Sequence, residues 1–319
     1  MALCANLFHR SNLIFLLALI CGITLSQGFP IGNALIFPAL IVILTITLLR
    51  FPRGFFRRPG PLLSASIQGN VMNYLVLGNF IILASIFLIH KQEFWVGMVL
   101  IAAMPPSLEI INLGNLSHIE NKSVFTSLAG AYLGALLIIP LIGLGFLKYI
   151  IPNYWNIIVI VLGLILLPLV LSRLVIDKEW DKSIEPYEET IIDYCYFIVF
   201  YTITASGRNI FMYWSSDLFI IASIAFISTF FFAFVIRKIG RYFHSNENKI
   251  TSFLLMGTMK DCGLAGGIAL ILFSREVALS SLIFAVFTFI HINWLKYKMR
   301  HIINDSNNKK ELRNLNLTN

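Results

Sequence analysis

Two short segments place charged or amide side chains next to helix-breaking residues inside otherwise apolar runs. The first spans Met104-Pro105-Pro106-Ser107-Leu108-Glu109-Ile110-Ile111-Asn112, and the second spans Met256-Gly257-Thr258-Met259-Lys260-Asp261-Cys262-Gly263. Side chains of these types can bind an ion, move a proton or hold a charged solute. A charge at the centre of a membrane helix costs about 2.5–3.5 kcal/mol on insertion scales. Charges retained in such segments therefore need a functional or structural reason.

The first segment predicts an interrupted helix. Pro105 and Pro106 lack a backbone N–H, and their rings force a kink. Glu109 and Asn112 are three residues apart and share one helix face, on which Asn115 follows. Either these side chains line a site at the kink, or the kink is only structural and the carboxyl lies near the membrane surface.

The second segment predicts another interruption, at Lys260-Asp261, with glycines on either side. One interpretation is a binding or coupling site. The alternative is a neutralising pair between Lys260 and either Asp261 or Glu109 that holds the helices together. The two interpretations are compatible, because a pair that locks two helices also determines what can bind between them.

The composition and the charge-free windows define the elements that must position these residues. Of 319 residues, 58% are hydrophobic and 13% are charged, about half the charged share of a globular domain, and the mean hydropathy is +0.81. This excludes a soluble enzyme, a disordered chain and a nucleic-acid-binding protein. The apolar windows predict ten membrane helices, at 11–27, 32–50, 59–90, 93–116, 123–147, 152–174, 190–207, 217–236, 250–273 and 277–295.

The basic residues support this arrangement. With the N-terminus in the cytoplasm, nineteen basic residues fall on inside segments, four fall outside, and Lys260 completes the total of 24. This asymmetry predicts that both termini are cytoplasmic, and it explains the net charge of +8 without an anionic partner. We expect an integral protein of a bacterial inner (plasma) membrane. A signal peptide is the competing interpretation of the N-terminus, but no small-residue cleavage site follows the first apolar run.

Ten helices divide into two groups of five, at 1–150 and 151–298, followed by a polar cytoplasmic tail at 299–319. The interrupted helices, 93–116 and 250–273, are the fourth of each group, and an odd number of helices inverts the second group relative to the first. Broken helices at matching positions of inverted repeats indicate the midplane site of a transporter. The freed backbone groups are tolerated only where they line a cavity or bind a ligand. The expected fold is therefore an all-α polytopic membrane protein with crossed broken helices 4 and 9.

This architecture and three short motifs resemble the bile acid:sodium symporter family. The family's helix 3 motif, Gln-x-x-x-Met-Pro, falls on Gln68 to Asn73 and matches at Gln68 and Met72. Its helix 4 motif, roughly Pro-Gly-Gly-Thr-x-Ser-Asn, falls on Pro106 to Asn112 and matches at both ends.

The helix 9 motif, roughly Glu-x-Gly-x-Gln-Asn-x-Gly-Leu-Ala, matches only at Gly263-Leu264-Ala265. Its glutamate is replaced by Met256, and its Gln-Asn pair by Lys260-Asp261. In the family, the helix 9 glutamate and glutamine, with a serine and an asparagine of helix 4, coordinate two sodium ions. The serine position is Ile111 in this chain. Sodium needs oxygen ligands, as hard cations do, and an ammonium group repels it.

These departures predict that Lys260 supplies the positive charge of the missing sodium and pairs with Glu109 or Asp261. Coupling would then be to protons or absent, and no cofactor is expected. The candidate site residues are Gln68, Pro106, Glu109, Asn112, Asn115, Met256, Lys260, Asp261 and Gly263. Of these, Glu109, Lys260 and Asp261 are assigned to coupling.

The resemblance implies secondary-active transport of a small or amphipathic organic anion across the lipid bilayer, and the positive amide ends of the broken helices suit such a substrate. Two alternatives stay open: a cation/proton antiporter of the same crossed-helix design and a non-transporting membrane sensor. We expect no enzyme, because the sequence shows no nucleophile–base pair, metal cluster or phosphate loop. His118 and His291 are predicted to lie near helix ends at the membrane interface.

Overall fold

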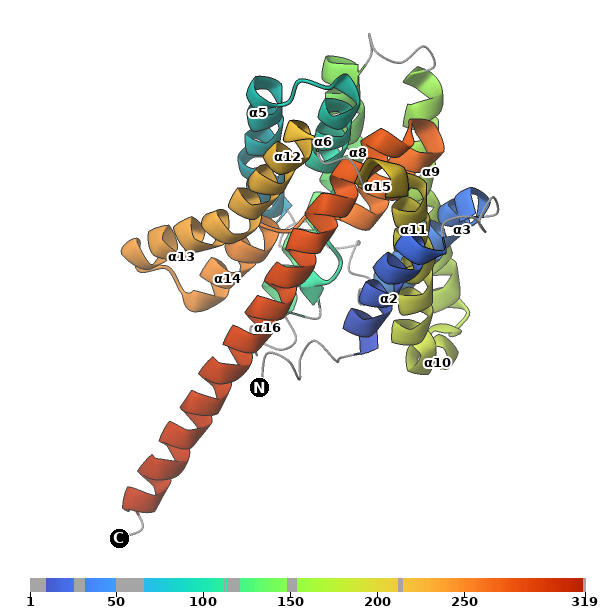
Figure 1. The fold of residues 1–319 in the computed structure, drawn as a ribbon. Helices are drawn as coiled ribbons and strands as arrows, with labels where there is room; N and C mark the ends of the chain where they lie inside the picture. The colour runs from blue at the N-terminus through green and yellow to red at the C-terminus, as the bar shows by residue number, and fades with distance from the viewer. Residues whose placement is uncertain are drawn as a thin grey trace.

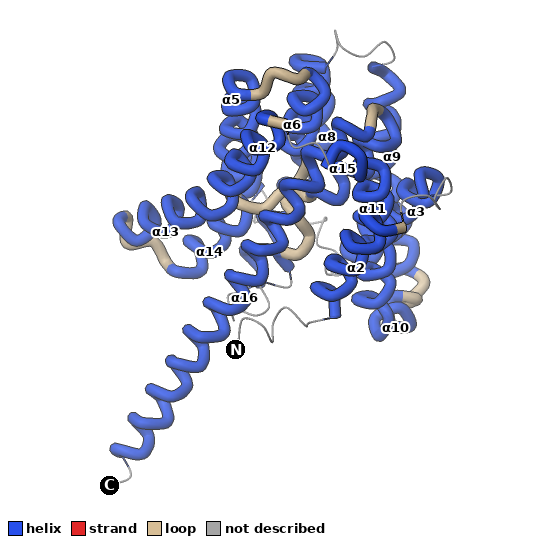
Figure 2. Tube along the Cα trace, in the orientation of Figure 1, coloured by secondary structure: helices blue, strands red, loops and turns tan. Residues whose placement is uncertain are grey.

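The computed structural model describes residues 10–25, 32–49, 66–111, 113, 121–147, 154–211 and 215–317 (Figure 1). Every regular element in these residues is a helix, and this part of the chain has no β-strand (Figure 2). The predicted fold class, all-α, is therefore confirmed for the described residues.

The described residues of the first half of the chain form a series of helices. In order they are α2 (Arg10–Thr24), α3 (Gly32–Leu49), a helix over Ser66–Leu88 that includes the π-helical η2 (Val71–Gly78) and α5 (Asn79–Leu88), α6 (Gln92–Ala103), a helical turn at 110–111, and α8 (Asn121–Ile142), which continues as η3 (Gly143–Leu147). Among the described residues of this half, the connection between α6 and the turn at 110–111 interrupts an expected membrane helix.

The described residues of the second half are also helical. In order it contains α9 (Tyr154–Asp177), the short α10 (Asp181–Ile184) and η4 (Glu185–Tyr187), α11 (Glu188–Phe211), α12 (Ser216–Phe226), η5 (Ile227–Phe231), α13 (Phe232–Tyr242), α14 (Glu247–Met256), α15 (Cys262–Leu272) and α16 (Arg275–Leu317). The break between α14 and α15 is the second one that the sequence predicts.

The polar segment after the last apolar run is helical. Helix α16 continues as far as Leu317 and projects away from the other helices (Figure 1). The reason is local: the chain contains no glycine or proline after Gly267, and the segment includes the good helix formers Lys309, Lys310 and Glu311.

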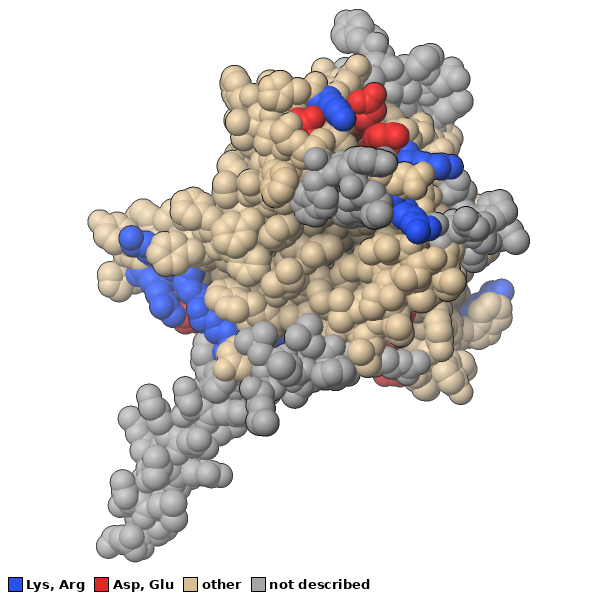
Figure 3. All heavy atoms as spheres, in the orientation of Figure 1, with Lys and Arg blue, Asp and Glu red and all other residues tan. Residues whose placement is uncertain are grey.

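The described residues include four helices that are long and apolar enough to cross a membrane. They are Ser66–Leu88, Val124–Ile142, Ser216–Tyr242 and Arg275–Lys298, and the shorter apolar helices are Asn12–Thr24, Ala34–Leu49, Gln92–Ala103 and Cys262–Leu272. On the face shown in Figure 3, charged side chains gather near the two ends, and a broad band without charge lies between them. These are the features of an integral membrane protein.

Close helix packing joins the two interrupted helices to α16, and α16 to α11. Gly97 of α6 leaves no room for a Cβ, because the backbone of Val277 and the side chain of Ser280 in α16 lie against it. Gly22 of α2 is similarly close to Thr204 of α11. Helix α16 packs on both α6 and α15, α11 packs on α15 and α16, and α2 packs on α11.

Candidate functional site

The first interrupted helix stops at its two prolines. Helix α6 ends at Ala103, Met104 is extended, and helical hydrogen bonding resumes at Ile110, whose N–H donates to the Ser107 carbonyl. The Ser107 hydroxyl accepts the Glu109 N–H at 3.4 Å and so caps the new helical turn. The sequence therefore fixes both the end of α6 and the restart.

The second interrupted helix ends with a glycine and restarts at an aspartate. Helix α14 ends at Met256 and is followed by Gly257, and α15 begins at Cys262 with Asp261 as its N-cap. One carboxylate oxygen of Asp261 accepts the Leu264 N–H at 2.9 Å. An acidic residue is well placed at a helix N-terminus, where the macrodipole is positive.

The two breaks are in direct contact. The Asp261 N–H donates to the Pro105 carbonyl at 3.0 Å, across 156 residues of sequence. The Lys260 amine donates to the Ala102 carbonyl at 2.8 Å and to the Met104 carbonyl at 2.9 Å. The predicted meeting of the two interrupted segments is therefore present in the structure.

The acceptor at Ala102 is available because of a proline. In a continuous α-helix this carbonyl would accept the N–H of residue 106, and Pro106 has none. The Lys260 amine donates to this carbonyl instead. The amine also lies 4.6 Å from the centre of the Tyr74 ring, a cation–π contact, and the Asn73 amide donates to the same Met104 carbonyl. Two carbonyls and an aromatic face thus enclose the ammonium group, which belongs to a residue only 2% exposed.

The Asp261 side chain accepts hydrogen bonds at this crossing, whereas the Lys260 side chain donates them. Besides the Leu264 amide, the Tyr132 hydroxyl of α8 donates to the second carboxylate oxygen at 3.3 Å, and Asp261 is 4% exposed. Two adjacent residues of opposite charge therefore interact with the ends of two different half-helices. Lys260 lies at the negative, carbonyl end of α6, and Asp261 lies at the positive, amide end of α15.

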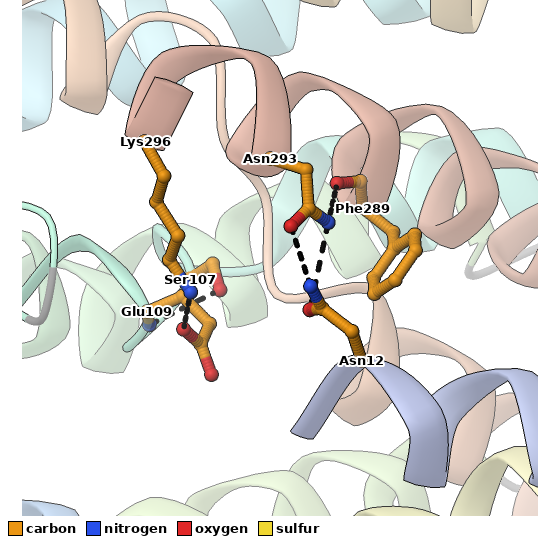
Figure 4. Close-up of polar contacts among 6 residues, drawn as sticks. All are labelled: Asn12, Ser107, Glu109, Phe289, Asn293 and Lys296. Carbon is orange, nitrogen blue, oxygen red and sulfur yellow. Dashed lines mark hydrogen bonds and ion pairs between the residues drawn. The ribbon is translucent and has the colours of Figure 1, made fainter. Parts of the chain in front are cut away.

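This arrangement corrects one prediction. Lys260 was expected to pair with Glu109 or Asp261, but its contacts among the described residues are the two carbonyls and the Tyr74 ring. Glu109 is instead 3.9 Å from the Lys296 amine of α16 (Figure 4). The physical reason is that the carbonyls freed by the prolines offer the ammonium group closer, fully buried acceptors.

A cavity of about 100 Å³ lies between the breaks and helices α2, α11 and α16. A water needs about 10–15 Å³ measured in this way, so the cavity holds several waters or a small solute. The charged residues that line it are Glu109, Asp193, Lys260, Asp261 and Lys296. Apolar walls, including Phe15, Phe200 and Phe289, complete it.

Helices α2 and α16 also meet beside this cavity through two asparagines. The Asn12 amide donates to the Asn293 side-chain oxygen at 2.6 Å, and the Asn293 amide donates both to Asn12 at 3.5 Å and to the Phe289 carbonyl at 2.9 Å (Figure 4). Both residues are buried. The polar pair therefore joins α2 to α16 on the same side as the Glu109–Lys296 pair.

The structure brings together some of the predicted site residues and not others. Glu109, Lys260, Asp261 and Gly263 all line the cavity. Pro106 acts through the carbonyl that it leaves free. Asn112 and Asn115 lie outside the described residues.

The remaining two candidates, Gln68 and Met256, are not among the residues that line this cavity. Gln68 is half-buried in the helix that packs on α8, where its neighbour Asn70 donates to the Gly130 carbonyl. Met256 is buried in the apolar core at the end of α14. Both are therefore part of the helix packing around the site.

Sequence reasoning missed several residues of the site. Lys296 follows an apolar run, where the sequence indicates only a basic residue that flanks a membrane span, and Asn12 carries no recognisable signal at the start of the first helix. Tyr74 and Tyr132 are single tyrosines in apolar helices, a pattern that is equally typical of ordinary packing. The proline at position 106 could have identified the Ala102 carbonyl as an acceptor, because the missing N–H is fixed by the sequence.

His291 is fully buried inside the protein, where its ring stacks on Trp294 and meets the edge of Phe230. His118 lies outside the described residues. Within the described part of the chain, no group of three His, Cys, Asp or Glu side chains is placed to hold a metal ion.

No protein-family model and no curated protein matches this chain.

Proposed function

We propose that this chain is a secondary-active membrane transporter whose solute passes the crossing of the two interrupted helices and whose cycle does not require sodium. The observation that most supports this proposal is that Lys260 lies at the carbonyl end of one half-helix and Asp261 at the amide end of another. An ammonium group already occupies the carbonyls to which a bound cation would otherwise coordinate, so the crossing carries its own positive charge.

The fold behind this proposal is two inverted five-helix repeats with ten membrane helices, as in the bile acid:sodium symporter family that the sequence resembles. The correspondence of the two breaks supports it: each falls in the fourth expected helix of its half, and the backbones meet at Asp261 and Pro105. In this arrangement both termini are cytoplasmic, in a bacterial inner membrane.

The proposed substrate is a small organic anion, and its binding cation is Lys296. The α15 amide end is not available to an anion, because Leu264 donates to Asp261. The Lys296 amine, by contrast, is 3.9 Å from Glu109, longer than the 2.7–2.9 Å of a tight charged hydrogen bond. A substrate carboxylate in the cavity can displace Glu109 from Lys296. The volume of about 100 Å³ favours a small anion over a bulky amphipathic one.

One observation favours a second candidate, a cation/proton antiporter. The cavity is lined by three carboxylates, those of Glu109, Asp193 and Asp261, and by two amines. Carboxylates in a membrane protein commonly mark proton or cation pathways. In this alternative, Glu109 leaves Lys296 in order to bind a proton or a cation.

Proteoliposomes containing the full chain separate these candidates. We expect uptake of one or more small carboxylates from a labelled panel, with equal rates in sodium and choline buffers and with faster uptake when a pH gradient is imposed. Sodium-dependent uptake would contradict the proposed mechanism. Cation-driven proton movement without carboxylate flux would establish the antiporter instead, and the absence of all flux would favour the non-transporting sensor.

A further inference from the structure

The end of α13 gathers positive charge on one face. Arg237 and Arg241 are four residues apart and therefore neighbours on the helix surface, where like charges destabilise each other. Lys298 of α16 is close enough for its charge to act against both arginines. Its amine lies 4.8 Å from the centre of the Trp294 ring, which holds it at this face. Basic side chains run along this edge of the molecule in Figure 3, from α13 toward α16.

Little negative charge balances these three residues in the described part of the chain. The Arg241 Nε atom is 3.3 Å from a Glu247 oxygen, but both side chains are largely exposed, and such pairs contribute little. The Arg237 Nε atom is buried and has no hydrogen-bond partner among the described residues. A buried donor without an acceptor is unfavourable. The cluster therefore lacks an anion that could accept from Arg237.

The surroundings of the cluster are apolar and exposed. Phe234, Tyr242 and Phe243 all have exposed side chains at this end of the candidate span Ser216–Tyr242. The span has 27 residues, which is about 40 Å of helix at 1.5 Å per residue. Because the hydrocarbon core is only about 30 Å thick, the last turns reach the level of the lipid headgroups. Aromatic side chains are typical of that level.

We propose that Arg237, Arg241 and Lys298 form a binding site for the phosphate of an anionic phospholipid, with the acyl chains lying against Phe234 and its neighbours. Phosphate oxygens match the planar donor geometry of two guanidinium groups, and Arg237 gains the acceptor that it lacks. Free inorganic phosphate shares this chemistry. The exposed aromatic side chains favour the lipid, since a free ion would gain nothing from them. This site is separate from the transport site and does not depend on the proposed function.

Native mass spectrometry of the detergent-purified full chain tests the proposal by measuring dissociation constants for phosphatidylglycerol and phosphatidylcholine. We expect tighter binding of phosphatidylglycerol. Each basic residue near a membrane surface contributes enough for about a fivefold change in affinity, so Arg237→Gln and Arg241→Gln should each weaken that binding by about fivefold. Lys182→Gln is the control: it removes an exposed basic charge that pairs with Glu179 on the other side of the molecule, outside the cluster and away from Phe234 (Figure 1).

Two further measurements keep the result interpretable. Arg241→Lys retains the charge and should retain most of the lipid affinity, which excludes general unfolding as the cause of any loss. Added inorganic phosphate should not displace the lipid. Equal binding of the two lipids, or equal losses in Lys182→Gln and the arginine variants, would overturn the proposal. Displacement by phosphate alone would show an anion site but would overturn the assignment to a lipid.

Discussion

The amine of Lys260 lies 2.8 Å from the carbonyl oxygen of Ala102, an acceptor that would serve residue 106 in a continuous helix. Residue 106 is proline, so a side chain from the other half of the chain replaces the missing backbone donor. The relationship explains how a buried lysine is tolerated without a carboxylate partner. Charge-assisted hydrogen bonds to the end of α6, whose dipole is negative there, stabilise the ammonium group.

Replacement of Lys260 by methionine should lower the stability of the folded protein. The variant keeps a similar apolar stem but leaves the Ala102 and Met104 carbonyls without the amine, and hydrogen bonds to charged groups contribute about 1.5–3 kcal/mol each. We expect a loss of about 3 kcal/mol, measured by thermal unfolding in detergent. Lys182→Met is the control, since its pairing with Glu179 is exposed. Equal stability of the two variants would contradict the role given to Lys260.

Replacement of Pro106 by alanine should partly rescue Lys260→Met. Alanine restores an N–H at residue 106, which can donate to the Ala102 carbonyl once α6 extends past Met104. In the single variant this N–H competes with the Lys260 amine, and in the double variant it replaces the amine. A double-mutant cycle on thermal stability should give a coupling of about 1 kcal/mol. Strictly additive effects would show that Pro106 and Lys260 do not share this acceptor.

The Glu109–Lys296 pair should affect substrate affinity more than stability. The two side chains are partly exposed and 3.9 Å apart, and such pairs contribute about 1 kcal/mol or less. In proteoliposomes, Lys296→Gln should raise the KM for the transported anion by about tenfold or more, which corresponds to about 1.4 kcal/mol. Glu109→Gln should lower the KM, because Lys296 is released for the substrate. A lower KM in Lys296→Gln would instead support a cationic substrate.

The Asn12–Asn293 pair should respond differently to single and double replacement. Asn12→Ala or Asn293→Ala removes one side of the hydrogen bond between two buried amides and should cost about 1–3 kcal/mol. Replacing both residues by leucine removes both amides together and should restore much of the stability in thermal unfolding. A double variant that is less stable than either single variant would show that the amides are needed for more than mutual hydrogen bonding.

The sequence was sufficient to locate the breaks but not to identify the partners of the charges. Proline and glycine mark helix ends because they change backbone chemistry directly, so the ends of α6 and α14 could be predicted. The partners of Lys260 are backbone carbonyls, and any residue type supplies one. The sequence therefore favoured the visible acids, Asp261 and Glu109, although both have other contacts.

Lys296 illustrates a second limit. A basic residue after an apolar run is typical of a membrane anchor, and nothing in the local sequence distinguishes an anchor from a residue that reaches back to Glu109. The contact depends on α16 packing against the first break, which is tertiary information. The continuation of α16 to Leu317 shows the reverse case, because local helix propensity alone accounts for a helix in this polar segment.

The most direct test of the central claim is thermal unfolding of the wild-type chain and of Lys260→Gln in sodium, potassium and choline chloride. A ligand that binds the folded state raises the unfolding temperature by mass action. If the lysine amine occupies the place of a coordinated cation, the wild-type protein should unfold at the same temperature in all three salts. A sodium-specific rise in the wild-type protein would show that a sodium site persists beside Lys260 and would contradict the account.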